Sequence, residues 1–235
     1  MAGPSARSGT LEEGQVRAMF DRIAGVYDVM NSVMTAGMHH RWRERAVDLA
    51  RVGPGSRALD VATGTGDLAI ALAARGADVV GSDFSDGMLD RARLKSSAVR
   101  WEFGNALELG YPDDTFDAAT VGFGARNFSD LAQGLSEMTR VVRPGGRVVV
   151  LEITTPTRPP LSTFFSLWFD RIVPLLGRVT GEDQAYTYLP SSVKRFPGPR
   201  ELGAVMAGAG LVDVRWILTA GGIIAIHSGT VDGQR

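Results

Sequence analysis

The stretch Arg57-Ala58-Leu59-Asp60-Val61-Ala62-Thr63-Gly64-Thr65-Gly66-Asp67-Leu68-Ala69 decides the fold. It begins as a short apolar run, passes through a turn with two glycines and continues into a helical pattern over residues 67–75. The turn matches the pattern G-x-G-x-x-A, whose glycines let the backbone turn sharply and approach a ligand closely. Because a helix follows at once, its free N–H groups face the same ligand. This order of elements predicts a ligand site, and a dinucleotide pyrophosphate is one candidate occupant.

Strand-like and helical patterns alternate along the rest of the chain. The apolar runs cover residues 57–62, 78–83, 98–103, 116–122 and 147–152, and the helical patterns between them cover 67–75, 86–95 and 130–142. Alternation at this spacing is typical of βαβ units, so it predicts an α/β fold with a parallel sheet and helices on both faces. Two final runs, 211–220 and 221–230, meet at Gly221-Gly222 without a helix between them, which predicts an antiparallel C-terminal hairpin at the sheet edge.

The N-terminal part of the chain has a different pattern. Apolar residues at helical spacing predict an amphipathic helix over 12–34, interrupted at Gly25, and a second helix over 40–51. We expect residues 11–52 to form an N-terminal helical lid on the core. Residues 1–10, MAGPSARSGT, are small and polar, so we expect a disordered leader and no secretory signal.

Length and charge limit the classes of protein. A chain of 235 residues suits one domain, here 11–235, with an α/β core over 53–235 and an apolar insertion near 156–198. Lysine and arginine total 25 against 26 for aspartate and glutamate, so the net charge of −1 provides no broad cationic face and predicts no nucleic-acid partner. The absence of cysteine excludes a disulfide framework, a cysteine nucleophile and a thiolate-bound metal.

No stretch of the sequence has the roughly 18 consecutive apolar residues of a membrane-spanning helix. The apolar stretch 161–177 is broken by Asp170, Arg171 and Pro174. Together with the polar leader, this pattern predicts a cytoplasmic protein.

Two carboxylates flank the glycine loop and decide between its candidate ligands. Asp60 lies at the end of the strand and Asp67 opens the helix. Both would repel a doubly charged pyrophosphate across a short gap. A ligand with a cationic end suits the loop better, and S-adenosylmethionine has a sulfonium and an ammonium that can donate to Asp60. The alternative is that Asp67 only caps the helix and the glycines only turn the chain.

Two further strand ends complete a candidate cofactor site. Asp83 ends the next strand, close to twenty residues after the glycine loop, where an acidic side chain can accept from both ribose hydroxyls of an adenosine. Asn105 and Ala106 follow the third apolar run, where a side-chain amide can reach an adenine edge. As alternatives, Asp83 could cap the helix that starts near Asp86, and Asn105 could serve a turn. The candidate cofactor-binding residues are Asp60, Thr63, Gly64, Gly66, Asp83, Asn105 and Ala106.

Several longer stretches resemble the demethylmenaquinone and ubiquinone C-methyltransferase family, a family of class I S-adenosylmethionine-dependent methyltransferases. The stretches similar to its N-terminal signature are Tyr27-Asp28-Val29-Met30-Asn31, Met34-Thr35 and His39-His40-Arg41-Trp42. Those similar to its second signature are Arg140–Arg147 and Leu151-Glu152-Ile153-Thr154. Phe123–Asn127 and Gly221-Gly222-Ile223 are also similar, so the resemblance runs from about residue 15 to residue 228.

The resemblance implies a Rossmann-like class I methyltransferase sheet and a reaction. It implies transfer of a methyl group from S-adenosylmethionine to a ring carbon of a reduced, prenylated quinol, and we expect demethylmenaquinol, in menaquinone biosynthesis, to be the substrate. The alternatives are a ubiquinone precursor or another lipophilic phenol. A nicotinamide-dependent oxidoreductase that uses the Gly64 loop and a cofactor-binding scaffold without turnover are alternatives from other classes.

Catalytic candidates follow from the chemistry of the implied substrate. A ring carbon becomes nucleophilic when the adjacent phenol loses its proton, so the site needs a base or a cation that stabilises phenolate. Arg126 lies just past the fourth apolar run with Asn127 beside it, at the edge where α/β sheets bind ligands. The alternative for Arg126 is an ion pair with a surface carboxylate.

The N-terminal segment supplies the candidate substrate-binding residues. Tyr27 and Asn31 lie one helical turn apart and could close over the site, or could pack between helices. His39 titrates near neutral pH and could be the base, whereas the adjacent Arg41 and Arg43 favour an exposed helix start. The three histidines show no metal-binding spacing, so we expect no metal.

The apolar insertion has two interpretations. It could line a groove for the polyprenyl chain or touch a bilayer surface, or its helix could pack on the sheet. The residues in question are Phe164, Phe165, Leu167, Trp168, Phe169, Ile172, Val173, Leu175 and Leu176.

Overall fold

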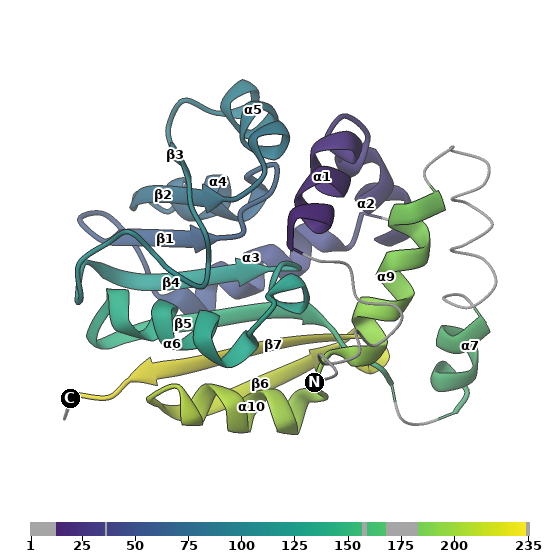
Figure 1. Ribbon diagram of the computed structural model, residues 1–235. Helices are drawn as coiled ribbons and strands as arrows, with labels where there is room; N and C mark the ends of the chain where they lie inside the picture. The colour runs from purple at the N-terminus through teal and green to yellow at the C-terminus, as the bar shows by residue number, and fades with distance from the viewer. Residues whose placement is uncertain (1–12, 36, 157–158, 168–182, 234–235) are drawn as a thin grey trace, which may run out of the picture.

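A mixed sheet of seven strands forms the centre of the computed structural model, which describes residues 13–35, 37–156, 159–167 and 183–233. The strands are β1 (Arg57–Val61), β2 (Asp78–Asp83), β3 (Arg100–Phe103), β4 (Phe116–Gly122), β5 (Val142–Ile153), β6 (Leu211–Thr219) and β7 (Ile224–Val231). Their order in the sheet is β3-β2-β1-β4-β5-β7-β6 (Figure 1). Strands β1 to β5 pair in parallel, and β7 pairs antiparallel with both β5 and β6. The α/β fold and the antiparallel edge hairpin predicted from the sequence are confirmed.

Helices follow most of the parallel strands, as the alternating patterns predict. They are α1 (Glu13–Ile23), α2 (Tyr27–Thr35), α3 (His39–Ala50), α4 (Asp67–Ala73), α5 (Asp86–Lys95), η1 (Ala125–Asn127), α6 (Leu131–Val141), α7 (Leu161–Leu167), α9 (Asp183–Arg195), α10 (Pro199–Gly208) and η3 (Ala220–Gly222). Ser85 caps the N-terminus of α5, because its hydroxyl accepts from the N–H of Met88. Asp130 caps α6 in the same way, through a carboxylate that accepts from the N–H of Gln133. The cap of α5 is therefore Ser85 and not Asp83.

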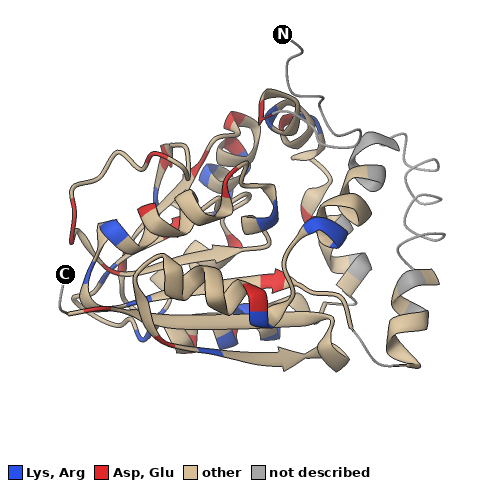
Figure 2. Ribbon diagram, turned by 60° about the horizontal axis from the view of Figure 1, so that its bottom comes forward, with Lys and Arg blue, Asp and Glu red and all other residues tan. Residues whose placement is uncertain are grey.

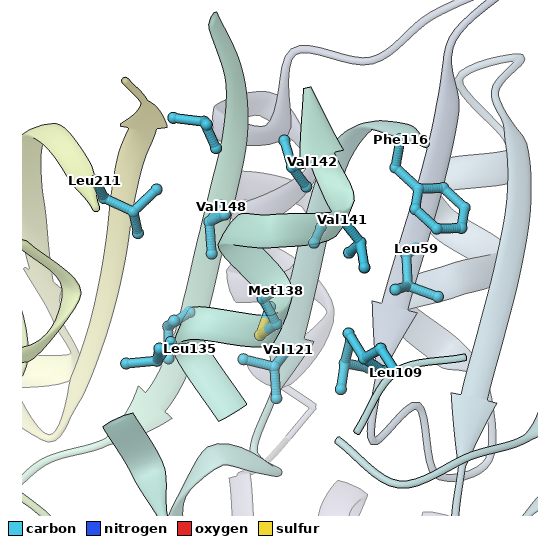
Figure 3. Close-up of a cluster of buried hydrophobic side chains, with 14 of the residues drawn as sticks. Leu59, Leu109, Phe116, Val121, Leu135, Met138, Val141, Val142, Val148 and Leu211 are labelled. Atoms are coloured by element: carbon cyan, nitrogen blue, oxygen red, sulfur yellow. The ribbon is translucent and has the colours of Figure 1, made fainter. Parts of the chain in front are cut away.

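One face of the sheet packs against α6 and α10. Figure 3 shows Leu135 and Met138 of α6 beside Val121 and Val148 of the central strands. These side chains are fully or almost fully buried, together with Leu202 and Met206 of α10. Burial of such side chains is the main favourable contribution to folding, so this cluster fixes α6 against β4 and β5.

The other face of the sheet packs against α3 and α4. Trp42, Ala46 and Val47 of α3 join Leu68 and Leu72 of α4 in a second buried cluster. Helix α3 is thus part of the layer that covers the sheet. Of the segment 11–52 expected to form a lid, α1 and α2 alone lie beyond the carboxyl ends of the parallel strands, next to α9 (Figure 1).

The helix predicted over 12–34 is interrupted near Gly25, as expected. Helix α1 ends at Ile23, and the N–H of Val26 donates to the carbonyl of Ile23 at 3.0 Å before α2 begins. Acidic and basic residues are interspersed along the described elements (Figure 2). Several acidic residues link α1 and α2 to the loops at the carboxyl ends of the strands.

Parts of the apolar insertion and the expected leader lie outside the described residues. These parts include residues 1–10 together with Trp168, Phe169, Ile172, Val173, Leu175 and Leu176, and the side chain of Phe164. In α7, Phe165 is buried and Leu167 is exposed. None of the helices in the described ranges combines the length and the hydropathy needed to span a membrane.

Candidate active site

Asp60 is a buried carboxylate inside β1, in the floor of a cleft at the carboxyl ends of β1 and β2. It accepts hydrogen bonds from the hydroxyls of Thr63 and Thr120, both at 2.6 Å. Burial raises the pKa of Asp60 to about 6, although the two hydroxyls act in the opposite direction. A carboxylate held in this way gains from a cationic ligand, because a positive charge offsets the cost of its burial.

Gly64 and Asp83 join the glycine loop to the end of β2. The N–H of Gly64 donates to Oδ2 of Asp83 at 2.7 Å, and the N–H of Ser85 donates to Oδ1 at 2.9 Å. Burial raises the pKa of Asp83 to about 6 as well. The N–H of Phe84 also acts on this carboxylate, and since a carboxylate has about four acceptor positions, Asp83 can still accept from a ligand hydroxyl.

The two glycines of the loop have different roles. Gly64 has a φ of 57°, and a Cβ built on it would meet no atom within 4 Å, so the space beside it is the cleft itself. Gly66 has a φ of 86°, and a Cβ there would overlap the ring of Trp101. Gly66 therefore shapes the loop against Trp101, whereas Thr63 and Gly64 line the cleft. A Gly66 contact to the cofactor stays a prediction.

Asn105 and Ala106 line the same cleft, after β3. The side-chain amide of Asn105 is already in use, because its Nδ2 donates to Glu13 of α1 at 2.9 Å and its Oδ1 accepts from the N–H of Leu107 at 2.9 Å. Asn105 thus ties the first lid helix to the cleft. Nδ2 has a second hydrogen, which an adenine contact could use while Glu13 keeps the first.

Two further carboxylates, one in each of the lid helices α1 and α2, bind residues beside the first cleft. Asp28 of α2 accepts from the hydroxyl of Thr65 and from the ammonium of Lys95, both at 2.6 Å. Asp21 of α1 accepts from the hydroxyl of Ser85 at 2.6 Å. Together with Glu13, they attach α1 and α2 to the loops after β1, β2 and β3.

Asp67 does not cap its helix. The cap position of α4 is Gly66, which makes no side-chain hydrogen bond. The carboxylate of Asp67 instead pairs with Arg43 at 2.9 Å and with Lys95 at 2.6 Å. Its charge is balanced by two cations, whereas no described lysine or arginine forms an ion pair with Asp60 or Asp83.

A second, larger cavity lies beneath the lid and is mostly apolar. It has a volume of about 1400 Å³ including its open mouth, against about 970 Å³ for the first cleft. Five residues line both cavities, so the two cavities adjoin: Phe20, Tyr27, Asn31, Arg43 and Phe123. The apolar walls of the second cavity include Met19, Ile23, Trp42, Ile153, Phe165, Leu189 and Ile223.

Arg126 lines the second cavity and forms an ion pair with Glu152, the last charged residue of β5. Its Nη1 lies 2.8 Å from Oε1 of Glu152 and also donates to the carbonyl of Phe123. The side chains are 7% and 1% exposed. Burial acts to lower the pKa of Arg126, but the Glu152 carboxylate more than offsets this, so the pKa rises above its ordinary value. The ion pair expected as the alternative exists, but its carboxylate is buried, not on the surface.

Asn127 faces the first cleft, although it follows Arg126 directly. Its Oδ1 accepts from the hydroxyl of Tyr188 in α9 at 3.1 Å. The two catalytic candidates thus line different cavities. Tyr188 also lines the second cavity and belongs to the apolar insertion expected near 156–198.

His39 and Arg43 correct the expectation of an exposed helix start. His39 is 3% exposed and Arg43 is 8% exposed, and both line the second cavity. Helix α3 begins next to α2 and runs behind the sheet in the view of Figure 1, so its first turn is covered. Among the described residues, no group of three or more histidines, aspartates or glutamates has the arrangement of a metal site.

Comparison with known proteins identifies the family. A family model described as the ubiE/COQ5 methyltransferase family matches residues 9–231. The chain belongs to the ubiE/COQ5 methyltransferase family. It is 47% identical over 218 residues to a demethylmenaquinone methyltransferase of Thermus thermophilus, with 90% of this chain and 99% of the relative covered. It is 41% identical over 228 residues to the ubiquinone/menaquinone biosynthesis C-methyltransferase UbiE of Geobacter sulfurreducens, with 93% and 89% covered.

Solved structures share the fold of this ubiE/COQ5 family member. The cyclase SpnF has a TM-score of 0.68 at 19% identity, with 96% of this chain and 99% of that chain covered. A phosphoethanolamine N-methyltransferase 2 of Haemonchus contortus, solved with S-adenosylhomocysteine, has a TM-score of 0.62 at 13% identity, with 95% and 61% covered. At these identities the likeness shows the Rossmann-like methyltransferase fold.

Membership of the ubiE/COQ5 family selects the methyltransferase interpretation of the glycine loop over the nicotinamide oxidoreductase alternative. The geometry changes the charge argument, because Asp67 is paired with Arg43 and Lys95. Of the two carboxylates expected to repel a pyrophosphate, Asp60 is the one without a cation beside it among the described residues. Sequence reasoning missed Glu152 and Tyr188 as site residues. Glu152 had a signal, since it is a charge inside the apolar run VVVLEI, where a buried carboxylate requires a partner.

Proposed function

We propose that this methyltransferase transfers the methyl group of S-adenosylmethionine to a ring carbon of demethylmenaquinol. The observation that carries the proposal is that an acidic cleft at the glycine loop adjoins a large apolar cavity, whose wall includes the buried guanidinium of Arg126. Relatives that are 47% identical are demethylmenaquinone methyltransferases, which supports the substrate.

The residues of the first cleft suit the cofactor. Asp60 can accept from the ammonium, and Asp83 can accept from a ribose hydroxyl beside its backbone donors. The open space at Gly64 admits a close approach of the backbone. S-adenosylmethionine supplies an electrophilic methyl group on a sulfonium, so the chain itself has to bind, orient and activate the quinol.

Arg126 is proposed to activate the quinol. Its cation favours the phenolate form of a ring hydroxyl, and negative charge then moves onto the ring carbon that accepts the methyl group. Because Glu152 and the carbonyl of Phe123 hold the guanidinium, it needs little reorganisation during the reaction. Asn127, fixed by Tyr188, is proposed to hydrogen-bond the same oxygen. Helices α1 and α2 contribute residues to the walls of both cavities and are proposed to limit the access of water to them.

The apolar cavity is proposed to hold the ring and the first part of the prenyl chain. Phe165 lines the cavity, whereas Leu161 and Leu167 of the same helix are exposed. Exposed leucines on a helix that also contributes to the cavity wall support peripheral contact with a bilayer, where a prenylated quinol resides.

We expect methyl-labelled S-adenosylmethionine and a reduced quinone extract to yield labelled menaquinol with the purified chain. The measurement is lipid extraction followed by mass spectrometry of the labelled product. Asp83→Ala, which removes the acceptors for ribose, serves as the matched control and should give little label at the same cofactor concentration. Label in a ubiquinone precursor would change the substrate, and no label in any lipid would contradict the proposed reaction.

The affinity for S-adenosylmethionine is expected to fall below about pH 6. Both Asp60 and Asp83 have a pKa raised to about 6 by burial, so below that pH they carry protons and lose their charge as acceptors. Their contribution to the stability of the free protein is fully present below the ordinary value of 3.8 and is lost as pH rises through about 6. Each carboxylate that has to be ionised for binding releases a proton near pH 6, so affinity should change by up to about tenfold per pH unit for one group and about 100-fold for both.

Calorimetry across this pH range, in buffers of different ionisation enthalpy, measures both the affinity and the released proton. In Asp83→Asn one of the two titrating groups is absent, so the dependence of affinity on pH should be shallower. An affinity that stays constant through pH 6 would show that neither carboxylate titrates with the ligand.

A further inference from the structure

His39 is a buried imidazole at the start of α3, and it lines the apolar cavity proposed to hold the quinol. Its neighbours in the cavity wall include Asn31 and Thr35 of α2 and Arg43 of its own helix. A neutral imidazole in this place can donate to a ring hydroxyl or accept from it. The hydrogen-bond partner of Nδ1 determines the tautomer and therefore whether Nε2 donates or accepts.

The tautomer of His39 follows from the hydroxyl of Thr35. That hydroxyl has one hydrogen, and it donates to the carbonyl of Asn31 at 2.7 Å. The same oxygen lies 2.6 Å from Nδ1 of His39. Because the hydrogen of Thr35 is already in use, Nδ1 has to carry a hydrogen and donate it to Thr35. Nε2 is then the unprotonated nitrogen, with its lone pair available.

The imidazole stays neutral at physiological pH. The pKa of His39 is lowered to about 4, mainly by burial and also by Arg43 and His40, while Asp67 and Asp28 act in the opposite direction. No described residue is hydrogen-bonded to Nε2 of His39. The cavity wall therefore presents a neutral acceptor at this position.

We propose that Nε2 of His39 accepts a hydrogen bond from a ring hydroxyl of the quinol, and that His39 thereby selects the reduced substrate over the oxidised quinone. The proposal rests on the proposed function, since it takes the apolar cavity to be the quinol site. It assigns His39 to substrate selection and not to proton removal.

The two redox forms of the substrate differ in whether their ring oxygens can donate a hydrogen bond to His39. A quinol has hydroxyls that donate, whereas a quinone has only carbonyl oxygens, which accept. A quinone oxygen facing Nε2 would place two acceptors against each other and leave both unpaired in a buried site, which is costly. Arg126 cannot make this distinction, because a guanidinium donates to a hydroxyl oxygen and a carbonyl oxygen alike.

The test compares two head-group probes, naphthohydroquinone kept reduced under nitrogen and naphthoquinone, by calorimetry with S-adenosylhomocysteine present. The wild-type chain should bind the hydroquinone about tenfold to 100-fold more tightly than the quinone. In His39→Leu the ratio should fall close to one, mainly through loss of hydroquinone affinity. Naphthol against methoxynaphthalene repeats the comparison with probes that are not redox active.

Thr35 provides a matched pair of variants that leave the imidazole in place. Thr35→Ser keeps the hydroxyl and should keep the ratio, whereas Thr35→Val removes the group that fixes the tautomer and should reduce the ratio. A reduced ratio in Thr35→Ser would contradict a role for the hydroxyl. Equal ratios in the wild type and His39→Leu would overturn the proposal.

Nitrogen NMR of the labelled imidazole tests the tautomer in the wild-type chain, without any variant. We expect a protonated Nδ1 and an unprotonated Nε2 at neutral pH, and a protonated Nε2 would overturn the proposal.

None of these measurements depends on methyl transfer. Selective hydroquinone binding without methylation would contradict the proposed function alone, and methylation without selective binding would contradict the role of His39 alone. If neither probe binds, the cavity is not a quinol site, and both the proposed function and the proposed role of His39 are contradicted.

Discussion

Arg126→Gln is expected to lower the free energy of unfolding by about 3 to 5 kcal/mol, because it leaves the buried carboxylate of Glu152 without its partner. Glu152 is 1% exposed, so water cannot replace the guanidinium. Glutamine can donate a hydrogen bond but carries no charge. Denaturant unfolding of the variant and the wild type, compared at constant m-value, measures the loss.

The double variant Arg126→Gln/Glu152→Gln separates the structural role of Arg126 from its proposed role in the reaction. With both charges removed, most of the stability should return, because two amides can pair where the ions did. The single-turnover rate of methyl transfer should stay low by about 100-fold to 1000-fold, as after loss of one electrostatic contact in other active sites. The rate should then rise with pH toward the phenol's ordinary pKa of about 10.

Two outcomes would contradict this account of Arg126. Wild-type stability of the single variant would mean that the ion pair does not hold the loop after β4. A stable double variant with the wild-type rate would mean that Arg126 is structural and that another group activates the quinol. The alternative expected from the sequence, an ion pair without a catalytic role, corresponds to the second outcome.

The parts of the fold that could be predicted depend on local patterns. The run 78–83 coincides with β2, and the helical pattern 86–95 coincides with α5, because their apolar periods and flanking polar residues lie within one element. Strand β5 instead begins at Val142, before the apolar run 147–152, and it crosses the turn residues Pro144 and Gly145. Its pairing with β4, from Phe116 to Val142, extends the strand across residues that predict a turn.

The parts of the site that could not be predicted depend on contacts between distant residues. Asn105 and Glu13 are 92 positions apart, so the sequence showed the amide at the strand end and gave no sign that the lid would bind it. The same holds for Arg126 and Glu152, where the arginine was found from its position and its partner was not. Burial of His39 under the lid likewise depends on how α2 and α3 meet. Local spacing identifies which side chains reach the strand ends, whereas their partners are fixed by tertiary packing.

Gly64→Val is expected to weaken the binding of S-adenosylhomocysteine by at least about 100-fold, or about 2.7 kcal/mol. Gly64 has a φ of 57°, and the space beside its Cα is open within 4 Å, so a valine would fill the cleft and not strike the protein. The branched side chain would also strain the turn that brings the N–H of Gly64 to Asp83 at 2.7 Å. Calorimetry of the folded variant measures the affinity.

Gly55→Val is the matched control, because it separates strain of the backbone from obstruction of the cleft. Gly55 has a φ of 86°, has no atom within 4 Å of a built Cβ and does not line the cleft. Both variants should lose about 1 to 2 kcal/mol of stability, since an L-residue is disfavoured in the left-handed region. Gly64→Val alone should lose affinity, because the strain is common to both variants and the obstruction is not. Equal affinities in the two variants would move the cofactor site away from the loop after β1.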